Sequence, residues 1–244
     1  MTYARYLCGP IAALMLVVTS ATAQSGQKAA AVHGEASASN HIMLGNLGED
    51  VDDYLGSADL WGSKADYWVI WIGWSNGNIT VRNDFADNGD EFQGWMADGG
   101  AFVGTTFTGD MHEVYELLPG VVATRNQHSS IETGHVVDTA HPIVNEPNDI
   151  TDDDYYTAWA WTAGDVYTEW EEYTVIATQT DDVDSPPLWL VHESLPVVVT
   201  TMQPPWSGHM RPEMVENIWT YVKNHKLQAV DPRGSLPLIW ATLK

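Results

Sequence analysis

Four aspartates crowd the stretch HPIVNEPNDITDDDYYTAW, which runs from His141 to Trp159. They are Asp149 and the run Asp152 to Asp154. Such a stretch can be a solvated loop, part of a ligand pocket, or a cage for Ca²⁺, which prefers several carboxylate and carbonyl oxygens. The spacing matches no EF-hand loop, and acidic runs in an acidic protein are usually solvated. Calcium is therefore the least favoured of the three interpretations.

A second candidate site is the segment QPPWSGHM, residues 203–210. It follows an apolar run typical of a buried strand, and open α/β sheets bind ligands outside the carboxyl ends of their strands. We expect Gln203, Trp206 and His209 at that edge, with Trp74, which ends an aromatic strand. An exposed indole beside polar groups suits stacking on a sugar ring. The alternative is that Trp206 caps the core.

Cysteine chemistry is excluded from the mature chain, because the only cysteine, Cys8, lies in an expected signal peptide. The segment MHEVYE, residues 111–116, reads HExxE and lacks the second imidazole of an HExxH zinc site. His128, His135 and His141 are scattered over loops, so we predict no metal and no cofactor. No Ser-His-Asp arrangement, phosphate-binding glycine loop or dinucleotide fingerprint is present.

The amino-terminal end is typical of a secretory signal. Arg5 precedes the apolar run IAALMLVVTSA, and ATA before Gln24 resembles a cleavage site. We therefore predict a signal peptide over residues 1–23, a flexible linker over 24–40, one α/β domain over 41–227 and a tail over 228–244. The mature protein is expected to be secreted, either extracellular or periplasmic, without a membrane span.

The charge balance is strongly acidic. The chain of 244 residues carries a net charge of −23, and removal of Arg5 with the signal makes it −24. Such a field repels nucleic acid and anionic membranes, which excludes both as partners. With 44% hydrophobic residues the chain has enough apolar content for a core. The acidity therefore indicates a solvated surface suited to salt-rich water, and several specific cation sites are the alternative.

Apolar runs of strand length alternate with helical patterns, which predicts an α/β fold. We expect a flavodoxin-like three-layer sandwich with a mainly parallel central sheet. HIMLGNL, residues 41–47, is expected to be a first short strand. The aromatic residues between Phe85 and Met96 are compatible with one helix, and a last long helix follows Pro212. The expected central strands are residues 67–73, 101–106, 175–178 and 197–201.

The order of these segments resembles the ThuA-like (trehalose-utilisation) family of the class I glutamine amidotransferase-like superfamily. The resemblance covers roughly residues 65–223. It is carried by ADYWVIWIGW (65–74), FQGWMADGGAFVGTTF (92–107), YELLPGVV (115–122) and HPIV followed by ITDDDYY (141–156). It implies a role in carbohydrate metabolism, with Asp152, Asp153 and Tyr155 bordering the pocket or bracing the His141 loop.

The chain also departs from the family pattern. Thr105 and Thr106 stand where the family often has a histidine, and the late strand ends in Met202-Gln203 where Gly-His is common. The thiol of true glutamine amidotransferases is absent. These departures put catalysis in doubt more than the fold.

From these observations we predict a protein that binds or processes a carbohydrate-type small molecule at the carboxyl edge of the sheet. Any catalysis is expected to be acid–base, with His141, His209 or Asp153 as proton carrier. The predicted ligand-binding residues are Trp74, Thr105, Thr106, Asp152, Tyr155, Gln203 and Trp206. The alternatives are a non-catalytic interaction module of an exported complex and a cation-binding surface protein. The oligomeric state is not predicted.

Overall fold

The computed structural model describes residues 28–33, 40–55, 59–73, 79–105, 112–125, 134–152, 165–200 and 212–229. A central sheet of eight strands runs through the described part of the chain. Its order is β2 (Val51–Leu55), β1 (Lys28–His33), β3 (Tyr67–Ile72), β4 (Ala101–Thr105), β10 (Val197–Thr200), β9 (Pro187–His192), β8 (Tyr173–Thr178) and β6 (His135–Val136). The first five strands are parallel, and the last three join by antiparallel pairing.

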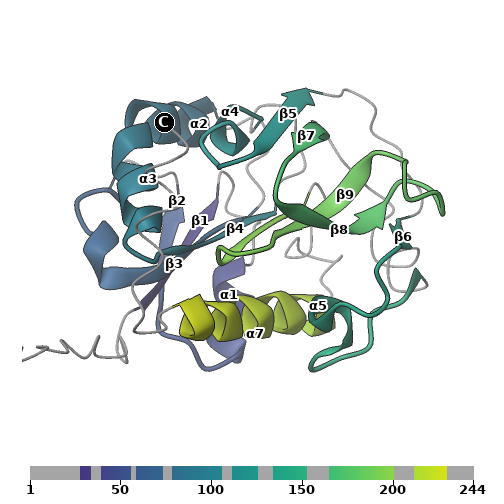
Figure 1. Ribbon diagram of the computed structural model, residues 1–244. Helices are drawn as coiled ribbons and strands as arrows, with labels where there is room; N and C mark the ends of the chain where they lie inside the picture. The colour runs from purple at the N-terminus through teal and green to yellow at the C-terminus, as the bar shows by residue number, and fades with distance from the viewer. Residues whose placement is uncertain are drawn as a thin grey trace, which may run out of the picture.

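Helices cover both faces of this sheet (Figure 1). One face packs against α1 (Asn40–Asn46), α5 (Pro142–Asn145) and α7 (Pro212–Ala229). The other packs against α2 (Ile79–Asp87), α3 (Gly89–Ala97), α4 (His112–Tyr115) and a two-stranded sheet of β5 (Val121–Arg125) and β7 (Asp165–Trp170). A short 3-10 helix, η1 (Lys64–Asp66), precedes β3. The predicted three-layer α/β sandwich with a mainly parallel sheet is confirmed.

The central strands form because their side chains are apolar on both faces. All six residues of β3 are buried. Trp71 stacks on Trp219 of α7, with ring centroids 6.3 Å apart, and Trp68 meets the same ring edge-on at 4.8 Å. A buried large apolar side chain stabilises the fold by about 1.5–3 kcal/mol. The aromatic run thus fixes both the strand and the helix that covers it.

The predicted linker over residues 24–40 is wrong for residues 28–33. They form β1, which lies between β2 and β3 and is buried along Ala29 to His33. Alanine is a poor strand former, so KAAAVH carries little strand signal, and burial between two neighbours overrides that preference.

Two further expectations are also wrong. Residues 41–47 belong mostly to α1 rather than to a strand, with Met43 and Leu44 buried against the sheet. The single helix expected between Phe85 and Met96 is divided into α2 and α3 at Asn88, whose side-chain amide donates to the Asp84 carbonyl at 2.7 Å. An asparagine that bonds the backbone in this way competes with continuation of a helix.

The expected strands at 67–73, 101–106, 175–178 and 197–201 correspond to β3, β4, β8 and β10. The antiparallel pairing of β9 with β10 agrees with the expected hairpin or neighbouring pair. Within the described ranges, no helix combines the length and apolar character needed to cross a bilayer.

Candidate functional site

The path of the chain creates a topological switch point between β1 and β3. From β1 the chain moves outward to β2 and then returns to the other side of β1 as β3. The connection through α1 packs on one face of the sheet, and α2 and α3 pack on the other. In open α/β sheets such a reversal opens a crevice at the carboxyl ends of the strands, where ligands bind.

A histidine–aspartate pair stands at the carboxyl end of β1. His33 is the last residue of β1 and is 3% exposed. Its Nε2 lies 2.7 Å from Oδ1 of Asp53 on the neighbouring β2, and the Asp53 side chain is 41% exposed. When Nε2 carries the ring proton, the carboxylate accepts it and orients the ring. A histidine held by a carboxylate is a common arrangement in acid–base sites.

The end of β3 is tied to the end of β1 beside this pair. The Gly73 amide donates to the Val32 carbonyl at 2.8 Å. Trp74, the next residue, lies outside the described residues. Thr105 ends β4, which is the neighbour of β3, so its backbone stands at the same edge. The structure thus brings the end of β4 to the edge that carries His33.

Most of the other residues predicted from sequence fall outside the described part of the chain. These are Thr106, Asp153, Tyr155, Gln203, Trp206 and His209. The segments that follow β1, β2, β3, β4 and β10, which continue from the carboxyl ends of the parallel strands, also lie outside it.

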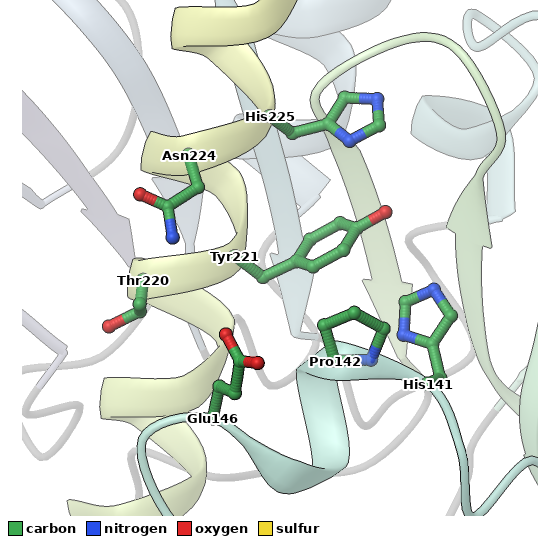
Figure 2. Close-up of a pocket in the computed structure, with 7 residues that line it drawn as sticks. All are labelled: His141, Pro142, Glu146, Thr220, Tyr221, Asn224 and His225. Atoms are coloured by element: carbon green, nitrogen blue, oxygen red, sulfur yellow. The ribbon is translucent and has the colours of Figure 1, made fainter.

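His141 lies in a different place, in a hollow between α5 and α7 (Figure 2). The hollow has a volume of about 290 Å³ and is lined by His141, Pro142, Glu146, Thr220, Tyr221, Asn224 and His225. The Tyr221 ring centroid lies 5.1 Å from that of His141 and 5.3 Å from that of His225. Aromatic and polar groups from both helices therefore meet in one cavity.

This hollow is near the amino ends of the parallel strands. Lys223 on the same part of α7 donates to Glu49, just before β2, at 2.8 Å. His225 hydrogen-bonds to the backbone of Ser194, just before β10. His141 is therefore not brought together with His33 or Thr105, and it lies away from the carboxyl edge at which we expected the ligand.

Burial tunes the ionisable groups of the hollow. Burial lowers the pKa of His141, against the opposing effect of Asp138, and the nearby His225 lowers it further. The pKa of His225 is also lowered by burial. Burial raises the pKa of Tyr221 to about 12. Both imidazoles and the phenol are therefore neutral at pH 7.

Asp152 braces a strand. Its Oδ1 accepts from the Val136 amide at 2.8 Å, and its Oδ2 lies 3.2 Å from Nδ1 of His135. Carboxylates commonly order irregular segments through such bonds. Among the described residues there is no group of three or more histidine, cysteine, aspartate or glutamate side chains placed to hold a metal ion.

Four residues at these two places were not predicted from the sequence: His33, Asp53, Tyr221 and His225. His33 follows four small apolar residues, and that run was the one available sign of a buried strand ending in a histidine. Tyr221 and His225 are spaced i, i+4 on the predicted last helix, which places them on one helical face. Nothing in the sequence connects that face to His141.

Comparisons with known proteins give likeness in structure only. No family model matches the chain, and no curated protein matches it in sequence. A Thermoplasma acidophilum protein that carries the name of a GMP synthase subunit is similar at a TM-score of 0.56 and 10% identity, over 83% of this chain and 95% of that one. This likeness shows a shared fold.

Two other solved structures are similar at lower TM-scores. A protein named as ThuA-like from Bacteroides uniformis gives a TM-score of 0.41 at 12% identity, over 84% of this chain and 91% of that one. A glutamine amidotransferase from Thermotoga maritima gives 0.49 at 10% identity, over 89% and 94%.

Proposed function

We propose that this chain is an exported α/β protein of the ThuA-like kind that binds a carbohydrate-type small molecule at the carboxyl edge of its sheet. His33 is the proton carrier of that site and Asp53 orients it. The site is thus moved from the His141 loop to the switch point between β1 and β3. Aspartate and imidazole hydrogen bonds to hydroxyl groups suit a polyhydroxylated ligand.

The observation that carries the proposal is the position of the His33–Asp53 pair. His33 is a polar ring at the end of a strand that is apolar from Ala29 to Val32, and the packing of the sheet alone does not require it. Its ring lies 2.7 Å from a half-exposed carboxylate, at the edge where this fold class binds ligands.

Amidotransferase chemistry does not fit this chain. Glutamine amidotransferases of this superfamily use a cysteine thiolate, and Cys8 is the single cysteine, 20 residues before β1. Thr105 occupies the carboxyl end of β4, and a threonine hydroxyl is a weaker nucleophile than a thiolate. Acid–base work by His33 needs no thiol.

Calorimetric titration of the mature protein with neutral mono- and disaccharides tests the proposal. We expect saturable binding of at least one sugar, weakened by roughly tenfold in His33→Gln and in Asp53→Asn, the magnitude of one lost hydrogen bond. The matched control is His135→Gln with Asp152→Asn. This second histidine–aspartate pair lies on and beside β6, at the opposite end of the sheet.

Equal binding by wild type, His33→Gln and Asp53→Asn, with all three folded by circular dichroism, would contradict the assignment of the site. Absence of binding across the whole panel would instead favour the interaction-module alternative.

A further inference from the structure

The segment around α5 is held to α7 by one buried amide. Asn217 of α7 is fully buried. Its Nδ2 donates to the carbonyls of Ile143 at 3.0 Å and Asn148 at 2.7 Å, and its Oδ1 accepts from the Asn148 amide at 2.9 Å. Ile143 and Val144 are buried against the same core. A helix of four residues has little stability of its own, so α5 depends on this contact.

His141 caps α5 in a way that requires a neutral ring. Its Nδ1 accepts the Ile143 amide proton at 3.2 Å, as the N-cap of the helix. An imidazolium carries a proton on both nitrogens and cannot accept a hydrogen bond. Protonation of His141 therefore removes the cap and places a charge beside Tyr221.

His192, in the turn between β9 and β10, also has to be neutral to keep its hydrogen bonds. Its side chain is fully buried, and its Nδ1 accepts from the amides of Ser194 at 3.1 Å and Leu195 at 3.2 Å. Its Nε2 has no hydrogen-bond partner among the described residues. Since His225 bonds the backbone of Ser194, α7 joins this turn to the hollow that contains His141.

Few negative charges face these three rings. Asp138 acts on His141, and Glu146 lines the same hollow. Glu172, in the turn between β7 and β8, places Oε2 3.8 Å from Nε2 of His192, beyond hydrogen-bond length. Two phenols also contact these rings: Tyr221 of α7 between His141 and His225, and Tyr173 of β8, whose ring lies edge-on to His192 at 4.7 Å.

We propose that His141, His192 and His225 form a proton-binding switch, in which protonation releases the α5 segment from α7 and loosens the turn between β9 and β10. The inference is independent of the proposed function, because it concerns the amino edge of the sheet and involves no ligand. The neutral state keeps the cap, the turn and the Asn217 contacts together. The charged state loses the acceptors and adds repulsion among three neighbouring rings.

The direction of the pKa shifts agrees with the direction of the switch. Burial lowers the pKa of all three histidines below the ordinary value, for His192 to about 4, and the charge of His225 lowers the pKa of the other two further. The unfolded chain therefore binds more protons than the folded chain below the ordinary histidine pKa of about 6.5. The contact is fully present above that pH and is lost as the pH falls through the lowered values.

A pH titration of the full-length protein by heteronuclear NMR, from pH 7.5 to 3.5, tests the proposal. The reporters are the backbone amides of Ile143 and Leu195 and the side-chain amide of Asn217. In the wild type we expect all three to change below pH 6, with Ile143 and Asn217 changing together and Leu195 following the lower pKa of His192. The Asn217 signals should move toward those of a solvated amide. The comparison variant is His141→Asn, because asparagine is a preferred N-cap that accepts the Ile143 proton and does not titrate.

In His141→Asn we expect the Ile143 and Asn217 transition to shift to lower pH by roughly one unit, equivalent to a tenfold change in proton affinity. The Leu195 transition, which depends on His192, stays. His135→Asn, a histidine outside the group, should titrate as the wild type does. An unchanged transition in His141→Asn, or Asn217 signals that stay fixed while Ile143 titrates, overturns the proposal.

Discussion

Gly120 occupies a backbone position that strongly favours glycine. It has a φ of +69°, and a Cβ placed there would lie 2.3 Å from the Glu171 carbonyl oxygen of the adjoining strand pair. The Glu171 amide also donates to the Gly120 carbonyl at 2.7 Å. A side chain would therefore push β5 away from the end of β7.

We predict that Gly120→Ala lowers the free energy of unfolding by about 1–3 kcal/mol, the cost of a strained backbone with a steric clash. Urea denaturation followed by tryptophan fluorescence measures it. Gly94→Ala is the control of opposite sign, because Gly94 lies inside α3 with open space around it. That variant should gain about 0.5–1 kcal/mol. A neutral Gly120→Ala would show that the turn has room to relax.

The sequence singled out individual residues only where a motif surrounded them. His141 was chosen beside a proline and a run of acids; it lines a cavity away from the expected edge, and its role in a site stays a prediction. Asp152 was expected to border the pocket or to brace the His141 loop, and its carboxylate accepts from the amide of Val136, which lies five residues before His141. No motif surrounds His33 in the sequence. Its proposed role depends on Asp53, and the two residues become neighbours only because β1 pairs with β2.

At the scale of elements, α7 covers one face of the sheet and also stabilises the segment after α5, because Asn217 completes the hydrogen bonds of that segment. We predict that Asn217→Ala costs about 2–4 kcal/mol, since the buried Ile143 carbonyl and the part-buried carbonyl and amide of Asn148 lose their partner. It should also increase proteolysis between residues 138 and 152. Chemical denaturation and timed digestion measure the two effects.

The control is Asn224→Ala, which removes the same side chain from an exposed position on α7. It should change stability by less than about 0.5 kcal/mol. Similar losses in both variants would mean that helix propensity rather than the buried amide determines the effect.

Elements were predictable where apolar residues filled both faces of a strand. YWVIWI, PLWLVH and VVVT read as buried strands and form β3, β9 and β10. The prediction missed β1 because alanines have a weak strand preference. It was wrong for α1 because HIMLGNL is too short to display a helical period. In both cases packing against the sheet decided the conformation.

For the whole molecule, the net charge of −23 is the dominant long-range term. The basic groups that do form ion pairs, such as Lys28 with Asp52 and Lys223 with Glu49, neutralise a small part of it. Self-repulsion among the remaining acids destabilises the compact state and is screened by salt.

We predict that the melting temperature rises between 20 mM and 1 M NaCl, measured by differential scanning calorimetry. Asp181→Lys, at an exposed position, should raise the melting temperature in low salt and have little effect in 1 M salt. The isosteric Asp181→Asn should give about half of the low-salt gain, since it removes one charge rather than reversing it. A melting temperature that is flat or falling with salt would count against repulsion as the main effect.

The neighbouring position of β4 and β10 has a consequence for the order of assembly. The two strands pair directly, yet residues 106–196 separate them in the chain. As synthesis proceeds from the amino end, β2, β1, β3 and β4 are complete long before β10 emerges, and β4 keeps one edge unpaired. Closing a loop of that length slows folding, and an open strand edge can pair with another chain. The last quarter of the sequence therefore completes the sheet and ends the interval in which a nascent chain is most exposed to aggregation.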